Sequence, residues 1–476
     1  MGAKKAISRR DFLRLSTALA AGAVAAACAP AAPQIVEVVK EVPVEKVVKE
    51  TVEVEKVVEK VVTGVPPRGK PVTLLYVSPL TADVELKWTH YWVDAWNEAR
   101  PDIQVRIEDV GWAQLPVKIK AYLAAGEPLD IATGVTAERY KMGWVEPLDE
   151  WLGDIKGLWI DMCFLRGSGC VYYEGDEPLW IGVPLYSGGE ALMVRKDYLG
   201  EAGITDIMAA TATWDDVKET AKKIYDPPNV YAWCHEMAEG ASISHVGAVL
   251  LQMNGLIDLS DFRPEKRDAY IEALKWMQEM WEFASPDSLS WQWRDKLTGW
   301  ATGMIGMMVM GTSMYGDLVP RAPELLSPEK MGILPLANGP SGPGRQMRGG
   351  VGGHWIFKQS KHKAECAEFM RFMSEGDQHN SFPMNLSCRK DVEAKRKAEL
   401  LTKFYPDWYG PECEWWFDDW FSLFDNYPVF MRAGYMPSEE INKLFMDQVV
   451  ELWRNSTTPE EMYDTLKPKI EAIRVK

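Results

Sequence analysis

The chain has 476 residues, of which 47% are hydrophobic, and this is enough for two or three globular domains with large cores. Its net charge is −16 at pH 7. If residues 1–27 are removed, 48 positive and 68 negative side chains remain, and the net charge becomes −20. Such a surface repels nucleic acid and anionic lipid, so we expect no role in binding either of them.

The N-terminus is predicted to be an export signal. Ser8–Arg14 contains two adjacent arginines followed by Phe12 and Leu13, which is typical of a twin-arginine signal. The apolar run Leu15–Ala27 is too short to span a bilayer, because a spanning helix needs about 20 apolar residues. Cys28 closes this run and is the predicted lipidation site; without lipidation it is trimmed away or left as a free thiol. We therefore expect an extracytoplasmic lipoprotein, anchored by lipid to the outer face of the bacterial cytoplasmic membrane.

Residues 28–70 form a low-complexity segment in which Val, Glu and Lys recur and no aromatic residue is present to nucleate a core. The composition predicts a tether that spaces the globular part from the membrane. A short coiled coil is the alternative, because Val47, Thr51, Val54 and Val58 recur at three- and four-residue steps.

Strands and helices alternate at the start of the globular part. The expected strands are Val72–Val77, Ile103–Val110 and Ile131–Gly134, and the expected helices are one with Trp88, Trp92 and Trp96 facing the core and one over Gln114–Ala125. This order predicts parallel pairing with right-handed crossovers, as in a Rossmann-like α/β lobe.

A second lobe is predicted to begin near Pro184. From there to the end of the chain the expected elements are a strand at Ala191–Val194, a helix opened by the capping box Thr213–Asp216, a helix at Pro264–Phe283, a buried strand at Met304–Met310, a helix capped by Ser360 that runs to Met373, an amphipathic helix at Ile441–Leu452 and a last helix from Pro459.

Several short motifs occur in an order that resembles a known family. They are Arg100–Val105, Ala121–Asp130, Gly143–Asp149, Ile181–Pro184, Ala191–Leu199, Thr213–Val217, Trp300–Met308, Gly349–Phe357 and Ala364–Met373. Their order and spacing are similar to those of extracellular solute-binding proteins of ABC importers, family 1, the sugar-binding group that includes maltose-binding protein. Two positions depart from the family pattern. Arg195 stands where the family usually has Asn. The family often has an aromatic residue just after the glycine that corresponds to Gly311, whereas the first aromatic residue here is Tyr315, four residues after that glycine.

The resemblance implies a two-lobed periplasmic-binding-protein fold (type II). Each lobe would be a mainly parallel sheet flanked by helices, and a ligand cleft would lie between the lobes and close by a hinge motion. The N-terminal lobe is expected at 71–183 plus about 333–375, and the C-terminal lobe at 184–332 plus about 376–476. The implied function is to bind a carbohydrate or similar polar solute and deliver it to an ABC permease, without catalysis.

Candidate ligand-binding residues lie in loops at strand ends, at the crossover between lobes and among the many tryptophans. They are Tyr76, Ser78, Trp112, Tyr186, Ser187, Trp233, Glu236, Trp293, Tyr315, His354, Trp355 and Trp415. No cofactor motif is present, and the six scattered histidines make a metal site improbable.

Three questions stay open from the sequence alone. Cys163 and Cys170 flank a flexible Gly-Ser-Gly turn and could form a disulfide. A secreted glycoside-active enzyme that uses acids from Glu414, Asp418 and Asp419 is an alternative function, since paired carboxylates suffice for that chemistry. A receptor that reports to a signalling protein is another.

Overall fold

The computed structural model describes residues 71–112, 114–134, 137–238, 243–383, 385–431 and 439–474. The predictions for the export signal, for Cys28 and for the tether lie outside these residues. Within them, no helix is long and apolar enough to cross a membrane.

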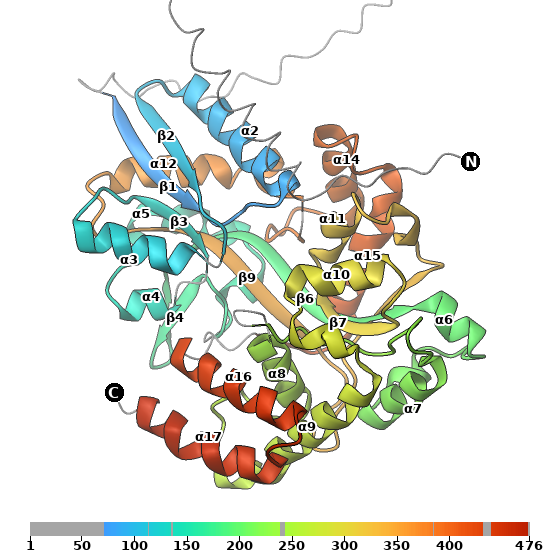
Figure 1. Cartoon of the computed structure of the whole chain (residues 1–476). Helices are drawn as coiled ribbons and strands as arrows, with labels where there is room; N and C mark the ends of the chain where they lie inside the picture. Colours follow the sequence, from blue (N-terminus) through green and yellow to red (C-terminus); the bar gives the residue numbers. More distant parts are fainter. Residues whose placement is uncertain are drawn as a thin grey trace, which may run out of the picture. The chain divides into compact units, whose positions relative to one another are not determined.

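The first part of the chain alternates strands and helices, as predicted (Figure 1). Its elements are β1 (Val72–Ser78), α2 (Asp83–Ala99), β2 (Ile103–Asp109), α3 (Leu115–Ala125), β3 (Ile131–Gly134), α4 (Ala137–Lys141), α5 (Asp149–Leu152), β4 (Val171–Glu174) and β5 (Glu177–Trp180). β1 pairs in parallel with β2 and with β3, which confirms the parallel pairing expected from the sequence. β4 and β5 form a separate antiparallel hairpin.

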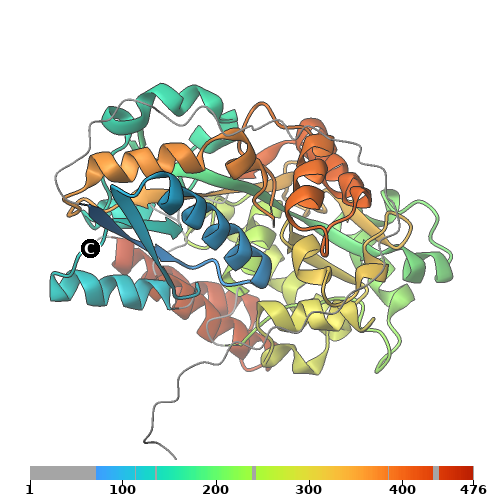
Figure 2. The same ribbon diagram turned by 90° about the horizontal axis from the view of Figure 1, so that it is seen from above.

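Helices cover both faces of this sheet. Leu74 and Tyr76 of β1 belong to the same core cluster as residues of α2 and α12 (Lys363–Met373), while Leu75 and Val77 pack with residues of α3. This alternation follows from the two-residue period of a strand. Figure 2, seen from above, shows β1 and β2 between the orange helix α12 and the cyan helix α3.

The middle and last parts of the chain contain most of the helices. Their elements are β6 (Val183–Arg195), α6 (Lys196–Glu201), α7 (Trp214–Ile224), α8 (Ile243–Met253), α9 (Arg267–Met280), α10 (Trp293–Ala301), β7 (Met307–Gly311), α11 (Met314–Leu318), β8 (Met331–Leu334), β9 (Met347–Ile356), α12, α13 (Gly376–Asn380), α14 (Ala394–Phe404), α15 (Glu414–Asn426), β10 (Val429–Met431), α16 (Glu439–Trp453) and α17 (Pro459–Arg474).

β6 and β9 join the two parts of the sheet. The strand order is β2-β1-β3-β9-β6-β7, with β10 beside β9 and β8 beside β6. β6 is 13 residues long: Val183–Glu190 pairs with β9, whereas Glu190–Val194 pairs with β7. The pairs that β6 makes with β7 and β8 are antiparallel, which departs from the mainly parallel pairing that the resemblance implies for each lobe.

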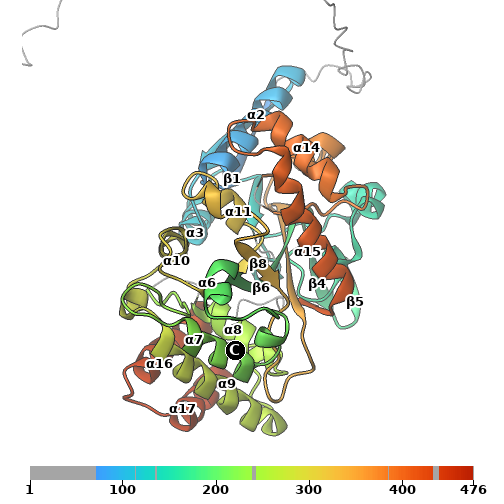
Figure 3. The same ribbon diagram turned by 90° about the vertical axis from the view of Figure 1, so that its right-hand side faces the viewer.

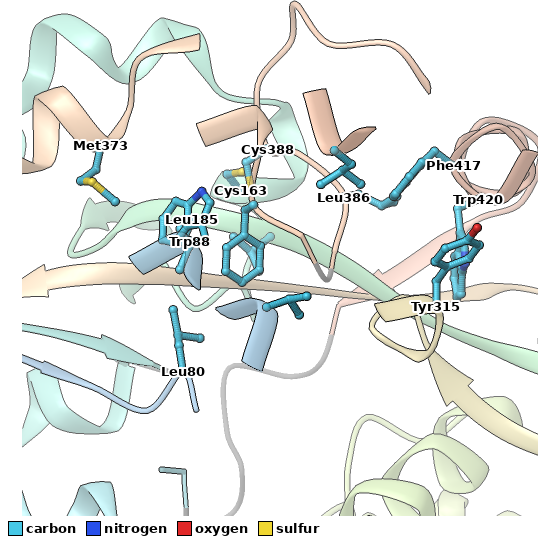
Figure 4. Close-up of a cluster of buried hydrophobic side chains, with 14 of the residues drawn as sticks. Leu80, Trp88, Cys163, Leu185, Tyr315, Met373, Leu386, Cys388, Phe417 and Trp420 are labelled. Atoms are coloured by element: carbon cyan, nitrogen blue, oxygen red, sulfur yellow. The ribbon is translucent and has the colours of Figure 1, made fainter. Parts of the chain in front are cut away.

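Alternate residues of β6 and β7 enter two large core clusters. One contains side chains of β1, α2, α12 and α15; the other contains side chains of α7, α8, α9, α16 and α17. Figure 4 shows part of the first, in which Trp420 and Phe417 of α15 lie near Tyr315 of α11. The aromatic residues of Glu414–Trp420 are therefore mostly buried on one side of a helix.

Local sequence signals account for most element boundaries. Thr213 caps α7 in a capping box, because its hydroxyl accepts the Asp216 N–H at 3.2 Å and the Asp216 carboxylate accepts the Thr213 N–H at 3.0 Å. Trp88 and Trp96 are buried in the core as predicted, while Trp92 is half-buried. The expected cap by Ser360 is wrong by two residues: α12 starts after His362, whose N–H donates to the Ser360 hydroxyl at 3.1 Å.

Candidate functional site

The carboxyl ends of β1 and β2 lie side by side and expose an indole. Ser78 and Asp109 are the last register pair of these parallel strands. The Ser78 carbonyl accepts the Val110 N–H at 2.9 Å, and its buried hydroxyl accepts the Leu80 N–H at 3.2 Å, so both groups hold the turn. Trp112 follows in the next turn and is 44% exposed. An exposed indole at this edge is free to meet a solute, because open α/β sheets bind ligands at the carboxyl ends of their strands.

Three polar side chains from neighbouring strands form a network inside the first lobe. The hydroxyls of Tyr76 and Thr133 lie 2.7 Å apart, and the Thr133 hydroxyl lies 2.8 Å from Nδ1 of His354. All three are buried. Burial raises the pKa of Tyr76 and lowers the pKa of His354 to about 3, so both stay neutral at ordinary pH. The network lies beneath α12, where Phe369 packs against the Tyr76 ring.

The segment of β6 near the junction packs tightly. Tyr186 is half-buried and stacks on Phe382, with ring centres 5.5 Å apart. Ser187 forms a two-way backbone bridge with Leu386, at 3.1 and 2.9 Å, and its hydroxyl donates to the Ser387 carbonyl at 2.9 Å. Ser187 therefore fixes the segment around residue 386 to β6.

β6, β7 and β9 meet at Glu190. Glu190 is the register partner of Arg348 on β9 and of Gly311 on β7. Its carboxylate forms an ion pair with the Arg348 guanidinium, and both side chains are largely buried. Next to Gly311 in the chain, the Thr312 hydroxyl donates to the Asn385 side-chain carbonyl. These contacts hold the strands together where β6 changes its pairing partner.

In the second lobe, the predicted residues Trp233 and Glu236 are fully buried. The Trp233 indole donates to Nε2 of His235 at 2.8 Å. Both carboxylate oxygens of Glu236 accept from Nζ of Lys296 on α10, at 3.0 and 2.9 Å. Glu236 thus anchors the chain just before residues 239–242, which lie outside the described part.

The remaining candidates differ in exposure. Tyr315 is buried and stacks on Tyr409, with ring centres 5.7 Å apart. Trp355 is buried among Phe357 and the residues of α3. Trp415 is half-buried at the start of α15. Trp293 begins α10, and its side chain lies outside the described part.

Glu414, Asp418 and Asp419 are exposed on α15. Partial burial of its carboxyl raises the pKa of Asp419; Lys196 acts against this rise and Asp418 adds to it. The three acids belong to one helix. Glycoside cleavage needs two carboxyl groups on opposite sides of the bond.

Two cavities lie near the β4–β5 hairpin. One of about 530 Å³ is lined by Tyr173 and Arg166 on one side and by Gln252 and Asp258 on the other. The other, of about 350 Å³, lies beside α4, and Tyr172 lines both. Figure 3 shows β4 and β5 on the side of the molecule away from α3 and α10. None of the candidate ligand-binding residues lines these two cavities.

The described residues contain no group of three metal-ligating side chains that could hold an ion. Cys163 and Cys170 are free buried thiols, so the disulfide considered from the sequence is not formed.

A model of the family described as bacterial extracellular solute-binding protein matches residues 82–378. The chain belongs to this family. No curated protein matched the chain in a direct comparison. The two-lobed periplasmic-binding-protein fold expected from the motifs is confirmed.

Several solved structures share this fold at low sequence identity. A maltose-bound protein of T. maritima, MalE3, is 19% identical with a TM-score of 0.68, covering 84% of this chain and 100% of that one. An ABC substrate-binding protein of Listeria monocytogenes in complex with cycloalternan is 17% identical with a TM-score of 0.65, covering 85% and 99%. A solute-binding protein of Thermotoga lettingae bound with alpha-D-tagatose is 17% identical with a TM-score of 0.66, covering 85% and 99%.

The sequence did not single out four residues that shape this region. Two of them contact candidate residues: Thr133 bonds to His354, and Lys296 bonds to Glu236. The other two lie where β6 changes its partner: Arg348 pairs with Glu190, and Asn385 accepts from Thr312. None of the four lies in a recognisable motif. Only the position of Thr133 could have been found from the sequence, since it lies one residue before the end of a predicted strand, where ligand-binding residues are expected.

Proposed function

We propose that this protein is an extracytoplasmic receptor that binds a carbohydrate, most simply an oligosaccharide, between its two lobes. Three structures with the same fold hold maltose, cycloalternan or tagatose. The family match carries the proposal, because it covers residues of both core clusters. The long strand β6, which exchanges partners at Glu190, supplies the connection about which such lobes would close.

The proposed contact residues are those that a solute can reach. Trp112, Tyr186 and Trp415 keep exposed ring surface, and an aromatic face can stack on the C–H side of a sugar ring. Tyr76, Ser78, Ser187, Glu236 and His354 are bonded within the protein and are proposed to position the loops that carry the contacts. Trp233, Tyr315 and Trp355 are buried and the side chain of Trp293 lies outside the described part, so no contact with the solute is proposed for these four candidates.

The proposal extends to location and partners. A twin-arginine signal with lipid attached to Cys28 would hold the receptor at the outer face of the membrane, where an ABC permease would accept the solute. The lobes are proposed at 71–183 with 333–375, and at 184–332 with 376–476. Side chains of α14 and α15 also enter the first core cluster, so residues 394–426 would connect both lobes.

The test is a direct binding measurement. Isothermal titration of the purified chain with maltose, maltotriose, chitobiose, xylobiose and tagatose should find at least one ligand with micromolar or tighter affinity, together with a raised Tm. Failure of every sugar, together with binding of an amino acid or peptide from the same screen, would refute the carbohydrate assignment.

The enzyme alternative needs its own assay. Turnover of chromogenic glycosides that is lost in Asp418→Asn would support it, whereas binding without turnover supports the receptor. A receptor that serves a signalling protein would bind the same sugars. Co-purification with a permease would support transport, whereas co-purification with a sensor protein would support signalling.

A further inference from the structure

The six cysteines after Cys28 are all free thiols, and all are buried. At most 3% of any of them is exposed. Extracytoplasmic proteins meet an oxidising environment, where thiols commonly pair. Six free thiols are therefore unusual at the location proposed above, and the following inference rests on that location.

Three of these thiols lie near one another in the folded interior. Cys163 and Cys388 contact each other through their side chains, and Cys170 lies near both. Figure 4 shows Cys163 and Cys388 next to one another. The backbone holds them there: the Ile160 N–H donates to the Cys388 carbonyl at 2.8 Å, and Nε2 of His379 accepts the Cys388 N–H at 3.1 Å.

The fold protects the thiols chemically as well as sterically. Burial raises the pKa of Cys170, Cys234, Cys366 and Cys388 well above the usual range, and it raises the pKa of Cys413 to about 12. The thiolate is the form that attacks a disulfide, so a thiol with a raised pKa exchanges slowly. An unfolded chain has no such protection, and its six thiols could join in 15 ways as three disulfides.

We propose that this chain must complete its fold with reduced thiols before it meets the oxidising compartment, and that the folded core then keeps those thiols reduced. Each disulfide formed too early would join two Sγ atoms and release two protons and two electrons. A disulfide oxidant of the extracytoplasmic compartment would accept the electrons and become a dithiol. The predicted twin-arginine signal fits this requirement, because that route carries proteins that are already folded.

A bond between Cys163 and another cysteine in the unfolded chain would block the native core. Cys163 lies in a short turn before β4, and Cys388 lies in the segment that bridges to β6 through Leu386. Both must reach the same interior to close the first cluster, so a wrong partner for either prevents that closure.

The experiment uses the full chain carrying Cys28→Ser, which removes the seventh cysteine. A chromogenic aromatic disulfide should titrate none of the six thiols in the native protein within minutes and all six in urea. Refolding from urea should restore the native circular dichroism and urea midpoint with a reductant present, and should fail with oxidised glutathione. Equal recovery under both conditions, or fast labelling of the native protein, would overturn the proposal.

A variant pair locates the effect. Cys163→Ala combined with Cys388→Ala should refold better in oxidised glutathione than the control Cys234→Ala combined with Cys366→Ala, which also leaves four thiols and whose Cys366 lies elsewhere, beside Ser360. Equal recovery of the two variants would contradict the role given to the Cys163–Cys388 region. All readouts are thiol counts, spectra and urea midpoints, and none of them requires a bound sugar. A failed sugar screen would therefore refute the carbohydrate assignment without affecting the test of the thiols.

Discussion

Nζ of Lys296 lies 3.0 and 2.9 Å from the two carboxylate oxygens of Glu236, and both side chains are fully buried. The ammonium and the carboxylate are thus each other's main counter-charge in the interior of the second lobe. This pair connects α10 to the segment that leads into α8, and a buried pair is sensitive to the loss of either member.

Removal of the cation should destabilise the protein strongly. Lys296→Met leaves the Glu236 carboxylate buried without its counter-charge, and we expect a loss of about 3–5 kcal/mol in the free energy of unfolding, measured by urea denaturation. Adding Glu236→Leu should recover much of this loss, because neither charge of this pair then remains in the interior. The control is Lys443→Met, which breaks an exposed i,i+4 pair with Asp447 and should cost about 0.3–0.5 kcal/mol. A loss for Lys296→Met as small as that of the control would contradict the assigned role.

Acid should destabilise the fold through its buried histidines. Burial lowers the pKa of His235 and of His354 to about 3, and it lowers the pKa of His379 well below the usual range. Below pH 6.5 the unfolded chain binds protons at these positions while the native protein does not. Stability is therefore fully present above pH 6.5 and falls as the pH drops toward 3, by up to about 1.4 kcal/mol per pH unit for each histidine.

A substitution separates this effect from general acid unfolding. His354→Gln can still accept a hydrogen bond from Thr133 but cannot be protonated, so its free energy of unfolding should fall less steeply between pH 6.5 and 5 than that of the parent chain. His362→Gln, at a half-buried position, serves as the control. Identical slopes for the parent chain and His354→Gln would exclude His354 as a source of the acid sensitivity.

The fold was largely predictable because its signals are local. The strand at Val72–Val77, the helix that ends at Gly126 and the capping box of Thr213 are all set by neighbours within a few residues. The prediction that Ser360 caps α12 was wrong because a serine just before a helical pattern is typical of an N-cap. Its hydroxyl instead donates to the Asp130 carboxylate at 2.6 Å. The length of β6 was missed because its pairing depends on three distant strands.

The site was less predictable because a polar residue's partner is a matter of tertiary structure. Glu236 looks like a hydroxyl-binding acid in the sequence, but Lys296, 60 residues away, occupies both of its oxygens. Likewise, His354 follows a glycine pair typical of an open loop, but the register of β9 with β3 places it opposite Thr133. No local pattern reports such pairings.

The glycines of β9 offer a matched test of packing at the junction. A Cβ at Gly352 would lie 2.4 Å from the Tyr186 ring, whereas a Cβ at Gly350 meets no atom within 4 Å. Gly352→Ala should therefore push Tyr186 off Phe382 and cost about 1–3 kcal/mol by overpacking, while Gly350→Ala should change the urea midpoint little. Equal midpoints for the two variants would show that Tyr186 moves without cost.

Trp112 provides the sharpest test of the proposed binding edge. Its indole is 44% exposed beside the carboxyl ends of β1 and β2, so Trp112→Ala should leave Tm nearly unchanged. If the indole stacks on the bound sugar, the same change should weaken the binding of whichever sugar the screen identifies by about tenfold or more, which corresponds to about 1.4 kcal/mol or more. Tyr91→Ala is the matched control, because Tyr91 is 53% exposed on α2 and its ring packs against Phe404 of α14. An equal change in Kd for both variants, or none for Trp112→Ala, would remove Trp112 from the site and shift attention to Tyr186 and Trp415.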